Sequence, residues 1–152
     1  MNKMKFKSIW LIYILIMITV ILVSGCIDQR FSPSVGFKLD KYSITVDDNT
    51  VSSEFVKATI TRLDNENIST VFVMKFFPQT PEDIYPVDVD GNEISELSTR
   101  PLKAKGAEDI LQFKVFGKKG GFTEAKSKIR IELWWNNTKI ENTDRILEVS
   151  VR

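Results

Sequence analysis

Apolar and polar residues alternate along several segments of the chain. In one of them, Val56, Ala58 and Ile60 alternate with Lys57, Thr59 and Thr61. Because successive side chains of a β-strand point to opposite faces, this period of two predicts strands with one buried face. The same pattern occurs in residues 42–46, 111–115, 128–135 and 147–152. From Gly36 onward, no segment shows a convincing helical period.

The middle of the chain is less regular. Residues 69–77 are apolar on both faces for much of their length, which predicts either a central strand covered on both sides or a strand near an edge of two packed sheets. Short strands over 85–89 and 93–97 are expected to flank Asp90-Gly91, a dipeptide typical of a hairpin turn.

About seven strands within the last three quarters of the chain favour an all-β fold, an antiparallel sandwich over residues 36–152. The pattern resembles the immunoglobulin-like modules common on prokaryotic surface proteins. This resemblance is architectural, because the Cys…Trp…Cys spacing of antibody domains is absent. A small barrel is the alternative.

The N-terminal segment has the layout of a secretory signal. Residues 1–7 hold three lysines and no acidic residue, and residues 9–23 are apolar except for Thr19. Ser24-Gly25-Cys26 then resembles the lipobox of prokaryotic lipoproteins. That resemblance implies that a lipid is attached to the Cys26 sulfur and that the chain is cut before this residue. An uncleaved signal anchor is the alternative, although the apolar run is shorter than the roughly 20 residues of a typical span.

These features divide the chain into a signal peptide (1–25), a lipidated tether (26–35) and the sandwich domain (36–152). Both interpretations of the N-terminus place the domain on the extracytoplasmic face of the cell membrane. Cleavage after residue 25 would remove three basic residues and no acidic one, so the exported part has 18 basic and 20 acidic side chains. This near-neutral balance excludes a strongly basic nucleic-acid binder.

The inventory of reactive side chains is small. The sequence has no His, the commonest general base and metal ligand, and its one Cys cannot form an internal disulfide. Gly117-Lys118-Lys119-Gly120-Gly121 lacks the Ser or Thr that follows the lysine of a phosphate-binding loop, so we interpret it as a turn. We therefore expect no enzyme activity and no cofactor.

One acidic segment partly matches a calcium loop. Asp88, Asp90, Asn92 and Glu93 are its candidate ligands. An EF-hand loop beginning at Asp88 needs glycine at its sixth position and glutamate at its twelfth, where this chain has Glu93 and Thr99. A structural turn is therefore favoured over weak calcium binding, and no metal site is firmly predicted.

Trp134 is the most informative candidate for a contact residue. Trp135 shares the parity of the apolar positions of its strand and is expected in the core, whereas Trp134 is expected to face outward. An outward Trp is typical of a protein contact, a sugar-stacking platform or a ring near lipid. In the alternative, segment 78–102 covers it. Asn67 and Asn136 begin Asn-x-Ser/Thr sequons and are possible glycosylation sites.

Together these observations predict a lipid-anchored, non-catalytic binding or assembly module of the cell envelope. Its expected partners are the membrane, through a lipid on Cys26, and another envelope protein, with no nucleic acid. Two alternatives remain open: a surface domain that binds a sugar or calcium, and a passive structural protein of the envelope.

Overall fold

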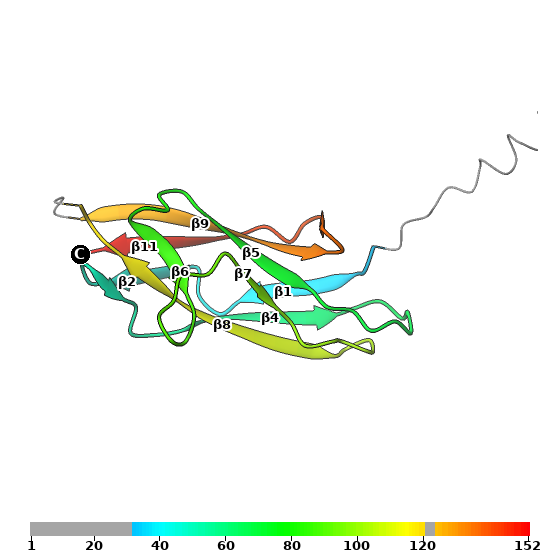
Figure 1. The fold of residues 1–152 in the computed structure, drawn as a ribbon. Helices are drawn as coiled ribbons and strands as arrows, with labels where there is room; N and C mark the ends of the chain where they lie inside the picture. The colour runs from blue at the N-terminus through cyan, green and yellow to red at the C-terminus, as the bar shows by residue number, and fades with distance from the viewer. Residues whose placement is uncertain (1–31, 121–123) are drawn as a thin grey trace, which may run out of the picture. The chain divides into compact units, whose positions relative to one another are not determined.

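The computed structural model describes residues 32–120 and 124–152, which form an all-β sandwich (Figure 1). Cys26 and the predicted signal segment lie outside these residues. Within the described part, no helix is long and apolar enough to cross a membrane. Residues 32–120 and 124–152 form eleven strands: β1 (Val35–Leu39), β2 (Ser43–Val46), β3 (Thr50–Val51), β4 (Val56–Arg62), β5 (Val73–Pro78), β6 (Ile84–Val87), β7 (Glu96–Ser98), β8 (Glu108–Gly117), β9 (Ala125–Trp135), β10 (Thr138–Lys139) and β11 (Arg145–Val151).

The strands form two sheets. Sheet one has the order β1-β4-β8-β3, and β6 also pairs with β8. Sheet two has the order β2-β11-β9-β5-β7, and β10 also pairs with β9. The series β1-β4-β8-β6 and β5-β9-β11 follow the A-B-E-D and C-F-G orders of a constant-type immunoglobulin sandwich. The predicted sandwich is therefore confirmed, with additional short strands beyond the expected seven, but it is not wholly antiparallel because β2 pairs with β11 in parallel.

The core lies between the sheets, where the predicted alternation places it. Val56, Ala58 and Ile60 are buried on β4, and Phe113 and Val115 are buried on β8. The edge of one aromatic ring meets the face of another across the core, since the ring centroids of Phe76 and Phe113 are 4.8 Å apart at 62°. Six further predicted inward positions, Ile129, Ile131, Leu133, Leu147, Val149 and Val151, are also buried. Tyr42, in contrast, is 49% exposed, and Ile44 and Leu111 are half-buried.

Strand β5 decides between the two interpretations of segment 69–77. Its inward residues Met74 and Phe76 are buried, but on its outer side Phe77 is 37% exposed. β5 lies beside β7, which is the last strand at that side of sheet two. The strand near an edge of two packed sheets is therefore confirmed, and the strand covered on both sides is wrong.

The predicted turn at Asp90-Gly91 is present and closes an antiparallel bridge, but the two strands that flank it do not pair with each other as a hairpin. β6 pairs with β8 in sheet one, whereas β7 pairs with β5 in sheet two. An isolated antiparallel bridge between Val87 and Glu93 closes the turn, with hydrogen bonds from the Asp88 amide to the Asn92 carbonyl and from the Ile94 amide to the Pro86 carbonyl. The turn chemistry is local, and the strand that follows it crosses to the other sheet because its partner there is β5.

The sandwich begins within the segment predicted as a tether. β1 starts at Val35, and the Ser34 carbonyl accepts a hydrogen bond from the Leu63 amide. Pro33 is already buried. The tether can therefore extend no further than about residue 32.

A close approach between the sheets occurs at Gly117. A Cβ atom there would lie 2.8 Å from Val151 Cγ2 and 3.2 Å from Val46 Cβ. We expect Gly117→Ala to lower the free energy of unfolding by about 1–3 kcal/mol, because the core must shift to admit the methyl group. Urea denaturation checks this value. Gly36→Ala is the matched control, since its Cβ would meet ordinary contacts of 3.6 Å or more, and equal losses in the two variants would contradict the argument.

Candidate functional site

The outer face of sheet two carries the candidate contact residue of the sequence. The strand register aligns Trp134 of β9 with Val73 of β5, and Glu132 with Lys75. Arg130, two residues further back, has Phe77 of β5 on one side and Ile146 of β11 on the other. These side chains share the outward parity of their strands, so aromatic, aliphatic and charged groups alternate across three adjacent strands.

Trp134 is half-buried on this face. Lys75 Nζ lies 4.5 Å from the centroid of its ring, and its Nε1 donates a hydrogen bond of 3.1 Å to Glu132 Oε2. A cation over an indole face is attracted by the ring quadrupole, so the two contacts hold the ring in one orientation. These two contacts come from β5 and β9, and neither comes from segment 78–102. Trp135, expected in the core, is partly buried and packs against it.

Glu132 was not predicted as a site residue. Its parity points outward, yet only 4% of the residue is exposed. Besides the Trp134 indole, it receives Lys139 Nζ at 3.1 Å and Arg130 Nε at 3.2 Å on Oε1. We call Lys75, Arg130, Glu132, Trp134 and Lys139 the Trp134–Glu132 cluster. The alternation marked Glu132 as solvent-facing, and its burial depends on long neighbours that lie above the sheet.

Lys139 extends the charge network to the turn that follows it. Its Nζ lies 2.6 Å from Asp144 Oδ1. The hydrogen bond to Asp144 contributes most to raising the pKa of Lys139, and the hydrogen bond to Glu132 adds to it. The same hydrogen bond from Lys139 lowers the pKa of Asp144. Both groups therefore stay charged over a wider pH range than isolated side chains. The cluster with Asp144 presents three cations and two carboxylates around one aromatic ring.

Asp88 of the candidate calcium loop serves its own backbone. Its Oδ1 accepts hydrogen bonds from the Asp90 amide at 2.8 Å and from the Asn92 amide at 2.9 Å. The hydrogen bond from the Asn92 side chain lowers the pKa of Asp88 most, and the hydrogen bond from the Asn92 backbone amide lowers it further. Among the described residues, no three His, Cys, Asp or Glu side chains are grouped to hold a metal ion. Calcium binding by Asp88, Asp90, Asn92 and Glu93 stays a prediction that this geometry does not favour.

The two sequons lie on the surface. Asn67 is exposed in the loop after β4, and Asn136 is exposed in the turn between β9 and β10. Asn136 and Asn137 have φ angles of 45° and 60°, a left-handed turn of the kind that Asn tolerates. Both side chains are accessible to a modifying enzyme, and glycosylation stays a prediction. The predicted lipid site, Cys26, lies outside the described residues.

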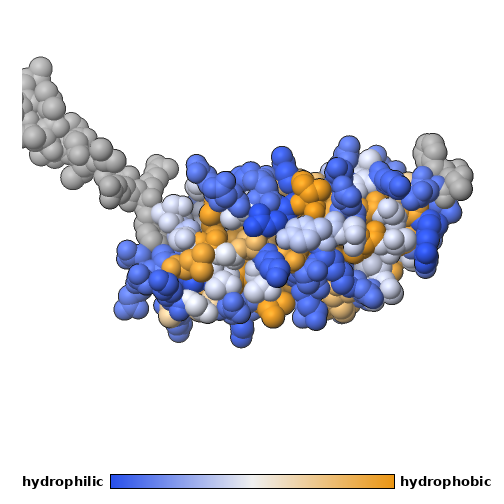
Figure 2. Space-filling view, turned by 180° about the vertical axis from the view of Figure 1, so that it is seen from behind, coloured by the Kyte–Doolittle hydropathy of each residue, from blue (hydrophilic) through white to orange (hydrophobic). Residues whose placement is uncertain are grey.

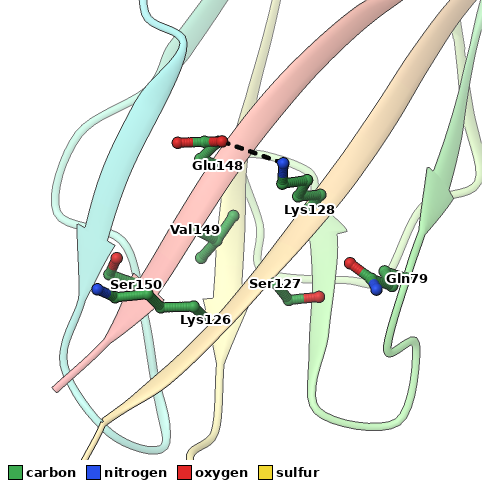
Figure 3. Close-up of a pocket in the computed structure, with 7 residues that line it drawn as sticks. All are labelled: Gln79, Lys126, Ser127, Lys128, Glu148, Val149 and Ser150. Atoms are coloured by element: carbon green, nitrogen blue, oxygen red, sulfur yellow. Dashed lines mark ion pairs between the residues drawn. The ribbon is translucent and has the colours of Figure 1, made fainter.

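A hollow of about 230 Å³ lies over β9 and β11 (Figure 3). Lys128 and Glu148 form an ion pair of 3.3 Å at its rim. Ligand pockets are typically 300–1,000 Å³ and largely enclosed. This hollow is smaller, and exposed charged side chains line it, namely Lys126, Lys128 and Glu148 with Gln79, Ser127, Val149 and Ser150. It does not provide an enclosed site for a small molecule.

A second group of outward aromatic side chains lies on sheet one. Tyr85 and Phe116 stack with centroids 4.9 Å apart, and Lys114 Nζ lies 4.8 Å from the ring centroid of Phe55. The sequence contained a signal for this group, because Phe116 has the same outward parity on its strand as Gln112 and Lys114. Unlike the Trp134–Glu132 cluster, it contains no buried carboxylate.

Neither a family model nor a curated protein matches this chain. Among solved structures, it is similar to the CARDB domain of the PF1109 protein of Pyrococcus furiosus, a structure in complex with di-metal ions. The two are 14% identical with a TM-score of 0.49, covering 78% of this chain and 93% of that one. The PapD-like domain 7 of human CEP192 is 13% identical with a TM-score of 0.41, covering 85% and 92%.

The periplasmic chaperone SfaE is also similar, with 10% identity and a TM-score of 0.39 over 77% of this chain and 56% of that chain. Identities and scores this low assign no family and carry over no site, ligand or partner. The description of the fold therefore rests on the strand order and register given above.

Proposed function

We propose that this chain is a lipid-anchored, extracytoplasmic binding module that contacts another envelope protein through the Trp134–Glu132 cluster. The cluster itself carries the proposal. A carboxylate that is 4% exposed on the outer face of a sheet is costly unless cations and donors satisfy it, and Arg130, Lys139 and Trp134 do so here. Buried ion pairs add little net stability. Trp and Arg, in contrast, are enriched at the centres of protein interfaces.

The shape of this face supports a protein partner over a small molecule. Trp134 presents its ring on a sheet surface, and the hollow of about 460 Å³ beside Lys139 and Asp144 is open to solvent and lined by polar side chains rather than enclosed by apolar ones. A sugar stacked on Trp134 would have to share or displace the Lys75 ammonium, which lies 4.5 Å from the ring centroid. The absence of His from the sequence supports binding rather than catalysis.

The anchor is a separate part of the proposal and rests on Ser24-Gly25-Cys26. Two acyl chains hold a protein durably at a membrane, whereas one chain does so only marginally. Metabolic labelling with a clickable fatty acid tests this part. We expect the wild-type chain to incorporate the label and Cys26→Ser to lose it. Equal labelling of the two chains would contradict lipidation at Cys26.

Binding through the cluster is tested by photocrosslinking in cells. A photoreactive residue replaces Ile146, which is 40% exposed beside Arg130. We expect a discrete adduct that Trp134→Ala reduces at least tenfold, because truncating a central interface Trp costs about 2 kcal/mol or more. Phe116→Ala, on the opposite outer face, is the matched control and is expected to leave the adduct unchanged.

Two outcomes would contradict the proposed contact. An adduct that survives Trp134→Ala would move the contact away from the cluster. The absence of any adduct, from a chain that is folded and present at the membrane, would favour the passive structural alternative.

A further inference from the structure

The end of the sandwich where β1 begins carries apolar side chains in water. Leu63 is 45% exposed, Ile68 is 49% exposed and Val71 is 42% exposed. All three belong to the loop between β4 and β5, and Figure 1 shows this loop at the same end as the start of β1. In Figure 2, apolar surface lies among polar side chains at this end as well as along the body. Exposed aliphatic groups gathered on one loop mark a contact surface.

This loop is held in place by a buried arginine. Arg62 is fully buried, and its guanidinium donates to the carbonyls of Glu66 and Ile68 and to the carboxylate of Asp64. A further bond of 2.9 Å reaches the Leu102 carbonyl on the neighbouring loop. The apolar side chains therefore project from a fixed platform, so their exposure is a property of the folded state and little ordering is needed for contact.

The neighbouring loop adds positive charge to the same end. Lys103 and Lys105 are exposed between β7 and β8, and the Gly106 amide donates to the Arg62 carbonyl, which ties their loop to the end of β4. Asp64 is paired with Arg62, which leaves Glu66 as the exposed acid of the apolar loop. Aliphatic groups flanked by lysines are typical of surfaces that lie at a membrane interface, where the lysines reach the headgroups.

The short distance along the chain from Cys26 to the sandwich indicates what covers these apolar side chains. Six residue steps separate Cys26 from Ser32, the first described residue, and an extended chain spans about 20 Å over that length. We propose that this end rests on the membrane that holds the lipid of Cys26, with Leu63, Ile68 and Val71 inserted at the interface. The inference rests on the proposed anchor. It adds that the fold itself contacts the bilayer and thereby orients sheet two relative to it.

A single introduced cysteine tests this contact. Because Cys26 is the only cysteine and its sulfur carries the lipid under the proposed anchor, a thiol placed elsewhere is the unique labelling site. Ile68→Cys receives a nitroxide in the full lipidated chain, purified from membranes and returned to phosphatidylcholine vesicles with and without phosphatidylglycerol. Power saturation then compares the accessibility of the label to oxygen, which concentrates in lipid, with its accessibility to a water-soluble nickel chelate.

Two control positions match the test site. Val89 is an exposed aliphatic residue, 66% accessible, in the loop after β6. Glu82 lies in the turn before β6, near the end of β8, because the Lys118 amide donates to the Asp83 carbonyl. We expect the oxygen-to-nickel ratio of the Ile68 label to exceed that of both controls several-fold. Anionic lipid is expected to raise it further, and Lys103→Gln with Lys105→Gln to remove that increase.

Three other outcomes would contradict either the membrane contact alone or the lipid anchor as well. Equal ratios at Ile68 and Val89 in a vesicle-bound chain overturn the membrane contact while the anchor stands. A label shielded from both oxygen and nickel indicates a protein neighbour at this end and also overturns the contact. A chain that leaves the vesicles in a buffer wash overturns the anchor and the contact with it.

Discussion

Replacing Arg62 with methionine is expected to lower the free energy of unfolding by about 3–5 kcal/mol, the usual cost of removing one partner from a buried ion pair. The Arg62 side chain is 0% exposed and its partner Asp64 is 11% exposed, so water cannot replace the lost contact without opening the loop. Methionine keeps the apolar stem but leaves the Leu102 and Ile68 carbonyls without this donor. Urea denaturation followed by Trp fluorescence measures the loss.

Arg100→Met is the matched control for this variant. Arg100 also pairs with a shielded carboxylate, that of Asp109, but its own side chain is 78% exposed. An exposed partner contributes roughly 0–1 kcal/mol, so we expect a much smaller loss. If both variants lost the same stability, the burial of Arg62 would not be the reason for its effect.

The pH dependence gives a second readout of the same contact. Burial alone would raise the pKa of Asp64, but hydrogen bonds from Arg62 and from the Glu66 amide outweigh it and lower the pKa below its ordinary value. The ionised Asp64 therefore stabilises the fold above about pH 4, and this contribution is lost as the pH falls through the lower folded pKa. We expect acid to destabilise the wild type more steeply than Arg62→Met, and parallel pH profiles would contradict this account.

Replacing Phe113 with alanine is expected to cost about 3–5 kcal/mol, because a fully buried ring leaves a cavity that the two sheets cannot fill. Phe113 belongs to sheet one and its ring meets Phe76 of sheet two, so the variant loses an aromatic contact across the core. Thermal unfolding monitored by circular dichroism measures the change in midpoint.

Phe116→Ala tests whether position, rather than residue type, sets this cost. Phe116 lies three residues along the same strand, half-buried on the outer face and stacked on Tyr85. Its removal leaves an open surface that water fills, so we expect a clearly smaller loss. A loss as large as that of Phe113→Ala would mean that the outer stack supports the sandwich as much as the core does.

Much of the fold could be predicted from the alternation of residues. The inward positions of β4, β8, β9 and β11 follow from a period of two, because each of these strands has one face on the core and one in water. The pairing of the two strands that flank Asp90-Gly91 with different sheets could not be predicted in this way. The turn residues determine the conformation of only four or five positions. The next strand, β7, pairs with β5, which lies elsewhere in the sequence.

The candidate site was predictable in part. Trp134 was identified because the alternation places this large, mostly apolar side chain on the face of the strand that points to solvent. Arg62 has the inward parity of Ile60, but the groups that satisfy its charge lie as far away as Leu102. Glu132 has the outward parity of Arg130, and its burial comes from side chains of β9 and β10 that fold over it. A pattern along one strand contains no information on such neighbours.

The parallel pairing of β2 with β11 has a mechanical consequence. The start of β1 and Arg152 lie at opposite ends of the sandwich (Figure 1), and four residue pairs join β2 to β11, from Ser43 with Glu148 to Val46 with Val151. Tension applied between the two ends would pull these parallel strands in opposite directions along their length. Their hydrogen bonds would then be sheared together rather than opened one at a time. The sandwich would therefore resist a force applied between the start of β1 and the end of β11 more strongly than a force that opens these hydrogen bonds in turn.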